Sequence, residues 1–258
     1  MDTIRPAAVA GMFYTDDATE LKTQVQHFLS EAQAAKHAPK AIIAPHAGYA
    51  YSGPIAGSAY APLLGKADQI RRVVLLGPAH RVYVNGIATS IANKFETPLG
   101  NVTVDQATIR TLVAEFEFLV YDDSVHEQEH SLEVQLPFLQ TILHDFQLLP
   151  FAVGDAEPAQ VEQLLERLWG GPETLIVISS DLSHYHDYAT AKRLDSFTSD
   201  RIVNLDPAAL TSENACGQIP VRGLLRCAVR HHLDCELVDL RNSADVAGGR
   251  GRVVGYGA

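Results

Sequence analysis

The sequence predicts a single three-layer α/β/α domain over residues 1–258, built on a mainly parallel mixed sheet. Short apolar runs of strand length alternate with amphipathic segments of helical period, which is the pattern of successive βαβ units. The length of 258 residues suits one large α/β domain. A composition of 47% apolar and 20% charged residues is typical of a soluble protein with a substantial core.

The predicted helices begin where a side chain can cap them or where a proline can stand in the first turn. Such starts occur at Asp16–Asp17, Ser52–Pro54, Asp105, Glu157–Pro158 and Asn214–Pro220. The predicted strands are apolar or β-forming runs, which lie at residues 42–44, 72–77, 147–153, 175–178, 236–240 and 252–255. Residues 188–214 are expected to be largely helical. Pro137 either kinks the helix that follows residue 131 or marks its first turn, and the sequence leaves both open.

Residues 82–104 depart from this alternation of strands and helices. Residues 82–91 alternate and are rich in β-forming residues, residues 97–101 have turn composition, and residues 102–104 form a short return strand. We expect an antiparallel hairpin here, at an edge of the sheet.

Charge and cysteine content exclude several classes of protein. The formal net charge of −11 argues against nucleic acid or an anionic membrane as the main partner, because phosphate binding needs clustered lysine and arginine. The chain has neither a long uncharged apolar run nor a signal-peptide pattern. Three cysteines without a CxxC pair suit a reducing compartment. We therefore expect a cytoplasmic protein with a small-molecule or peptide ligand.

Histidines follow the ends of three predicted strands. His46 and His80 each come after an apolar run and a proline, and His184 follows a third run together with Asp181. Open α/β sheets bind ligands at the carboxyl ends of their strands. A lone histidine in such a place could simply hydrogen-bond to the backbone. Two on consecutive βα units favour a shared metal or substrate site, because consecutive parallel strands are usually neighbours.

Asp181 also has a simpler interpretation as a helix N-cap, and a cap would explain the neighbouring serines as well. It would not explain the adjacent histidines, so we expect Asp181 to orient an imidazole or to take part in acid–base chemistry. Cys216 lies in a polar loop and is a candidate thiolate ligand or nucleophile. Cys227 is expected to be structural.

Residues 126–133 combine histidines with glutamates and have two interpretations. They are either a solvated acidic loop or a segment that points into the predicted site. His126 to His130 formally matches HExxH. We discount this match as a metalloprotease motif because it lies in a polar loop before the helix rather than within an amphipathic one.

Five strings in order resemble the Memo family: Pro45–Tyr49, Leu76–His80, Glu129–Glu133, Ser180–Tyr185 and Glu213–Gly217. The likeness runs from about Arg5 to Tyr256. The resemblance implies a relationship in fold to the class III, LigB-type extradiol dioxygenases, which hold non-haem Fe(II) with two histidines and a carboxylate. Prokaryotic members of the family, labelled AmmeMemoRadiSam system protein B, are often encoded with a radical-SAM protein and an AMMECR-type protein. Both are therefore expected partners.

The resemblance also implies roles for particular residues. His46 and His80 are the implied imidazole ligands, and Cys216 stands where the dioxygenases have their carboxylate. His184 with Asp181 beside it matches the acid–base histidine, and His130 is a third candidate catalytic residue. Phe13 and Tyr51 are implied ligand-binding residues at the mouth of the pocket. A thiolate is a softer ligand than a carboxylate, so the expected metal is iron(II) or copper, with zinc possible.

These observations leave two main functional hypotheses. The first is a metal-dependent redox enzyme with dioxygenase-like activity. The second is a non-enzymatic binding or adaptor protein that uses the same crevice for a peptide or a small anionic ligand. A zinc hydrolase is a third interpretation. The substrate is left open by the sequence.

Overall fold

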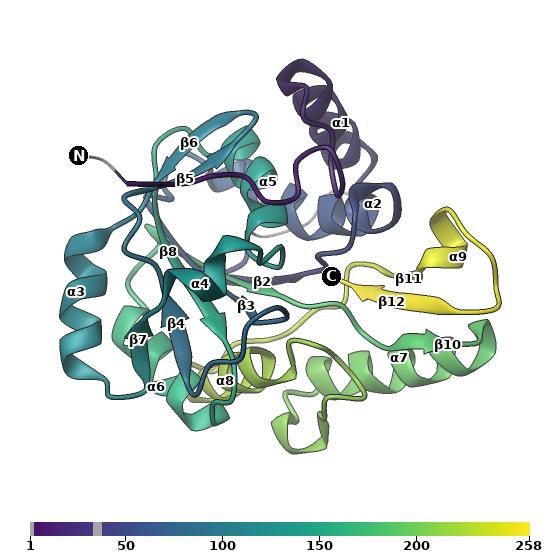
Figure 1. Ribbon diagram of the computed structural model, residues 1–258. Coiled ribbons are helices and arrows are strands. Elements are labelled where there is room, and N and C mark those ends of the chain that lie inside the picture. Colours follow the sequence, from purple (N-terminus) through teal and green to yellow (C-terminus); the bar gives the residue numbers. More distant parts are fainter. Residues whose placement is uncertain (1–2, 33–37) are drawn as a thin grey trace.

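A computed structural model describes residues 3–32 and 38–258, and it has the predicted α/β/α architecture with a mixed, mostly parallel sheet (Figure 1). The main sheet has six strands in the order β2-β9-β3-β8-β4-β7. Their bounds are Ala41–Ala44 (β2), Arg72–Pro78 (β3), Ile87–Thr89 (β4), Leu119–Tyr121 (β7), Gln147–Val153 (β8) and Thr174–Ser179 (β9). Only the β4–β8 pairing is antiparallel among the pairs described for this sheet.

The central strands form because they are almost continuously apolar. Residues 73–78 of β3 and all of β9 are buried, as expected for a parallel sheet covered on both faces. These strands have no alternating polar residues that could face solvent, so each strand is stable only when helices cover both faces of the sheet. Burying each large aliphatic side chain contributes about 1.5–3 kcal/mol, which places the core of the molecule along these strands.

Helices cover both faces of the sheet (Figure 1). One layer contains α1 (Ala18–Glu31), α2 (Tyr49–Tyr60) and α5 (Leu136–Ile142), and the other contains α6 (Pro158–Leu168) and α8 (Gln218–Arg230). The remaining helices are α3 (Gln106–Glu115), α4 (Asp123–Glu127), α7 (Tyr188–Val203), α9 (Ser243–Val246) and the 3₁₀ turns η1 (Ala61–Lys66), η2 (Glu133–Gln135) and η3 (Pro207–Ala209). The caps predicted for α1 and α3 are confirmed, since Asp17 accepts from the Glu20 N–H and Asp105 from the Thr108 N–H. Pro137 lies in the first turn of α5 rather than at a kink.

Two small sheets complete the fold. The first has the order β1-β5-β6, with β1 at Ile4–Arg5, β5 at Lys94–Thr97 and β6 at Gly100–Thr103. The second has the order β10-β12-β11, with β10 at His184–His186, β11 at Leu240–Asn242 and β12 at Val253–Gly257. The expected hairpin is only partly right: residues 82–91, predicted as its first strand, contribute β4 to the main sheet, and the return strand β6 pairs with β5 in a separate sheet that also contains β1. The antiparallel strand of the main sheet is β4.

The strand order corrects one step of the sequence argument. We expected the two strands that deliver His46 and His80 to be neighbours, but β9 lies between β2 and β3. Because all three strands are parallel, their carboxyl ends still meet at one edge of the sheet. The insertion of β9 brings its own polar end, from Ser179 to Asp181, between the two histidines.

In the part of the chain that the structure describes, no helix combines the length and the hydropathy needed to cross a bilayer.

Candidate metal centre

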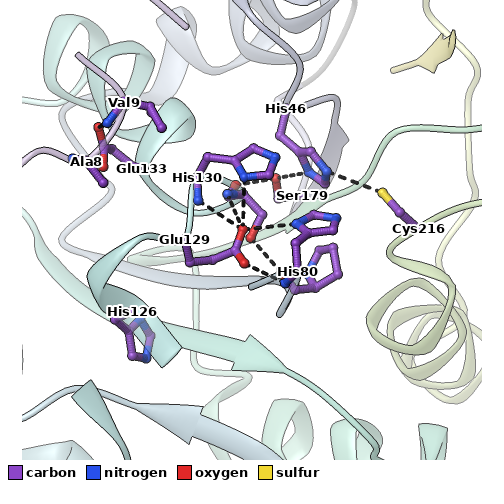
Figure 2. A network of polar contacts seen from close by, with 12 residues as sticks. Ala8, Val9, His46, His80, His126, Glu129, His130, Glu133, Ser179 and Cys216 are labelled. Atoms are coloured by element: carbon purple, nitrogen blue, oxygen red, sulfur yellow. Dashed lines mark hydrogen bonds and ion pairs between the residues drawn. The ribbon is translucent and has the colours of Figure 1, made fainter. Parts of the chain in front are cut away.

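Three imidazoles converge at the carboxyl edge of the main sheet (Figure 2). His46 follows β2 directly after Pro45, His80 follows β3, and His130 comes from the loop between α4 and η2. One ring nitrogen from each of the three lies within 4.8 Å of the other two. This is a group that could hold a metal ion, since neutral imidazole is the commonest metal ligand in proteins.

The three rings pack closely against one another, and their exposure to solvent increases from His46 through His130 to His80. The ring centroids are 5.1 Å apart for His46 and His80 and 4.8 Å apart for His80 and His130. The exposed fraction is 2% for His46, 14% for His130 and 28% for His80. Access to the group therefore lies on the His80 side. The ring of Phe13, 4.8 Å from that of His130, covers another side.

Burial keeps the imidazoles of His46 and His130 uncharged and ready to bind a cation. Burial, reinforced by the neighbouring imidazole of His80, lowers the pKa of His46 to about 3. Burial together with the nearby His46 lowers the pKa of His130 to about 4. Metal ligation requires the neutral imidazole, so at neutral pH no proton has to be displaced from these two rings.

Glu129 organises two of the three histidines. Its carboxylate accepts from the backbone N–H of His80 at 2.5 Å, from His80 Nδ1 at 3.0 Å, and from the N–H groups of His130 and Ser131. Burial alone would raise the pKa of Glu129, but the hydrogen bond and charge of His80 and the backbone donors lower it to about 2. A carboxylate that binds the second nitrogen of a histidine is the usual support of a metal-ligating imidazole.

The acidic loop is therefore not uniformly solvated. Glu129 and Glu133 are buried, whereas Glu127 and Gln128 are exposed, so the second of the two interpretations holds for Glu129 and His130. His126 lies apart from the group, and its Nε2 is 3.2 Å from the carbonyl oxygen of Ala88 (Figure 2). The HExxH match thus does not bring both of its histidines to one metal, in agreement with our discounting of it.

Cys216 lies at the edge of the histidine group. Its Sγ is 3.3 Å from His46 Nε2 and accepts from the backbone N–H of Asp181 at 3.3 Å. Burial, with the Asp181 carboxylate beside it, raises the pKa of the thiol to about 12. A bound metal ion would deprotonate such a thiol outright. The group of ring nitrogens contains two of the predicted ligands, His46 and His80, together with His130, for which we had expected a catalytic role, and the metal-binding role of Cys216 stays a prediction.

Asp181 does not have the partner that we expected. Its Oδ1 accepts from the backbone N–H of His46 at 2.7 Å, and not from an imidazole in any contact described for it. It does not cap a helix either, because β9 is followed by β10 rather than by a helix. Burial raises the pKa of Asp181, while the hydrogen bond from His46 opposes this shift. This carboxyl is therefore easier to protonate than a carboxyl in water.

The other predicted residues surround this centre at different depths. His184 begins β10 and is half-buried. Tyr51 lies on α2 with 43% of its surface exposed. These side chains are placed around the histidine group, and their catalytic or ligand-binding roles stay predictions.

Sequence reasoning did not identify three residues that support the centre. They are Glu129, Ser179 and Gln135, all of which are buried and contact the ligand-bearing segments. The matched string at 129–133 contained Glu129, and the polar end of the β9 run contained Ser179. Gln135 carried no signal, because a glutamine within a helical segment is normally assumed to face solvent.

The residues present fit a metal ion by their chemistry. Three imidazoles and a thiol are a donor set for transition metals of intermediate or soft character. Nδ1 of His130 is also buried without a hydrogen bond among the described residues, although it lies 3.4 Å from Glu129 Oε1.

The sequence was matched to those of known proteins and of a protein family. The sequence model of the Memo family, described as Memo-like protein, matches residues 5–258. A MEMO1 family protein of Methanobrevibacter smithii is 34% identical, covering 98% of both chains. One from Ignicoccus hospitalis is 34% identical over 99% of this chain and 97% of its own, and one from Thermoplasma volcanium is 32% identical over 98% and 96%. The chain therefore belongs to the Memo family.

Proposed function

We propose that this protein is a metal-dependent redox enzyme that holds iron or copper on His46, His80 and His130, with Cys216 as a further ligand. The observation that carries the proposal is the convergence of three imidazole nitrogens within 4.8 Å at the carboxyl edge of the sheet. Three separate segments of the chain supply these rings, and a purely structural role does not require them to meet.

The choice of iron or copper rests on the donor set. Imidazole suits iron, copper and zinc, whereas a thiolate shifts the preference toward softer ions. The resemblance to extradiol dioxygenases adds iron to the candidates, and Cys216 in place of their carboxylate adds copper. Zinc is the competing occupant and would point to hydrolysis, because zinc has no redox chemistry.

Iron or copper at this centre would supply Lewis acidity and one-electron chemistry. The chain's own residues would do the rest. The half-buried His184 is suited to accept and return a proton of the substrate, and Asp181 would hold a proton beside Cys216. Phe13 would exclude water from the His130 side. The substrate, a small molecule or a peptide, would enter at His80, and a radical-SAM protein and an AMMECR-type protein are proposed partners.

The first test is metal content by mass spectrometry on protein purified without added metal. We expect near-stoichiometric iron or copper in the wild type and its loss in His80→Ala and Cys216→Ala, with the fold retained by circular dichroism. Cys235→Ala is the matched control, because Cys235 lies outside the histidine group. Stoichiometric metal in both site variants would overturn the proposed ligand set.

The redox part of the proposal is tested separately by oxygen uptake with a panel of catechols, chosen for the resemblance to extradiol dioxygenases. Uptake that depends on the metal and falls in His184→Gln supports the proposal. Stoichiometric zinc without oxygen uptake would replace it with a hydrolase. A folded, metal-free protein that binds phosphorylated peptide, and loses that binding in His46→Ala, would instead establish the adaptor function.

A further inference from the structure

The hydroxyl of Ser179 lies at the centre of a buried network behind the metal centre (Figure 2). Its Oγ is 2.8 Å from His46 Nδ1, 2.9 Å from Gln135 Nε2 and 2.5 Å from the carbonyl oxygen of Ser131. Ser179 and Gln135 are both fully buried, with 0% of their surfaces exposed. Three partners fill the one donor and the two acceptor positions of a hydroxyl, so the protons of the network are distributed among these protein groups.

The orientation of the Gln135 amide follows from a backbone carbonyl. The carbonyl oxygen of Pro45, 2.9 Å from Gln135 Nε2, can only accept, so the amide nitrogen must face Pro45 and Ser179. The amide oxygen then accepts from the hydroxyl of Tyr60 at 2.9 Å. Gln135 thus donates to Ser179 and takes up one of the two acceptor positions of that hydroxyl.

The single proton of the Ser179 hydroxyl also has a fixed acceptor. Its nearest partner is the carbonyl oxygen of Ser131, which can only accept. With its proton given to Ser131, the hydroxyl can only accept from His46 Nδ1. His46 must therefore carry its proton on Nδ1, which leaves the lone pair of Nε2 facing the Sγ of Cys216 at 3.3 Å.

His80 is held in the same tautomer by a different group. Glu129 accepts several backbone N–H groups and also faces His80 Nδ1 at 3.0 Å, so Nδ1 of His80 donates, and in the neutral ring Nε2 carries the lone pair. His130 differs from both, because its Nδ1 is buried and has no hydrogen bond in the described part of the chain. Two of the three imidazoles are thus locked, and the third is not.

We propose that Ser179 is a positioning residue that sets the Nδ1–H tautomer of His46, with Gln135 orienting its hydroxyl. Together with Glu129, it presents two preformed Nε2 ligands, while His130 adjusts its ring to the ion that binds. Only the metal-affinity part of this inference rests on the proposed function. The tautomer is a property of the metal-free protein and can be measured without any ligand.

The test is two-bond ¹H–¹⁵N nuclear magnetic resonance on histidine-labelled, metal-free protein, with His46 assigned by its loss in His46→Gln. We expect a protonated Nδ1 and a bare Nε2 in the wild type, and a mixture of tautomers in Ser179→Ala. Ser90→Ala is the matched control, because Ser90 is an equally buried serine whose hydroxyl binds Asp123 outside the site. A wild-type His46 protonated on Nε2 would overturn the inference, and this arm needs no variant to fold.

The second arm titrates zinc alone against a chelator. Removing a group that orients a metal-ligating histidine costs roughly 10- to 100-fold in metal affinity, so we expect that loss for Ser179→Ala and none for Ser90→Ala. Equal zinc affinity in Ser179→Ala and wild type would overturn the positioning role. If neither zinc, nor iron(II), nor copper binds the wild type in the same titration, the proposed function is overturned, and the tautomer result still stands.

Discussion

Replacing Glu133 with alanine is expected to destabilise the protein strongly. The Glu133 carboxylate is 0% exposed and pairs with the guanidinium of Arg5. It also accepts from the N–H of Ala8 at 2.7 Å, the N–H of Val9 at 3.0 Å and the hydroxyl of Tyr14 at 2.6 Å. One side chain thus fastens the N-terminal segment, which carries Phe13, to the loop that carries His130.

The magnitude follows from burial. Removing one partner of a buried ion pair costs about 3–5 kcal/mol, because the remaining charge is left buried and uncompensated. Arg5→Ala is expected to cost a similar amount, since Arg5 also donates to the carbonyl oxygens of His126 and Glu129. The double variant should cost less than the sum of the two single variants, because neither charge then remains alone.

The assay is thermal unfolding of the metal-free protein, followed by circular dichroism. For a chain of this size, 1 kcal/mol corresponds to roughly 2–4 °C, so Glu133→Ala should lower the midpoint by roughly 6–20 °C. Glu115→Ala is the control: its ion pair with Arg167 at 3.0 Å is exposed, with side chains 49% and 40% accessible, and should contribute no more than about 1 kcal/mol. Equal shifts in the two variants would refute the reasoning.

Three further predictions concern other parts of the fold. Burial lowers the pKa of His126 to about 4 from an unfolded value of 6.5. The unfolded chain therefore binds more protons between these values, and roughly 3 kcal/mol of stability should be lost as the pH falls from 6.5 to 4. His126→Gln should flatten that part of the pH profile, and an unchanged profile would count against a neutral buried His126. Gly217→Ala should destabilise by about 1–3 kcal/mol, because its Cβ would lie 2.8 Å from the carbonyl oxygen of Ser179. Gly65→Ala, where a Cβ meets nothing within 4 Å, should cost nothing in the same denaturant titration. Asp105→Ala should cost about 1 kcal/mol through loss of the α3 cap, while Asp105→Asn should restore most of it.

The sequence by itself determined the local elements and the character of the site. Continuous apolar runs predict buried strands, and the structure contains β2, β3, β8 and β9 at those places. A proline or a polar residue at the end of each run predicts where the chain leaves the sheet, which is where His46 and His80 lie. These predictions succeed because hydrophobic period and capping depend only on residues close together in the chain.

Only the tertiary structure decided which distant segments meet. The order β2-β9-β3 places Ser179 and Asp181 between the two histidines, although β9 is last of the three in sequence. From its sequence, the loop at 126–133 is equally consistent with a solvated acidic stretch and with part of a site. In the structure its carboxylates are buried because Arg5 pairs with Glu133 and backbone N–H groups donate to Glu129 and Glu133. No local pattern encodes these contacts, because the burial of a charge is stable only when donors from remote segments converge on it.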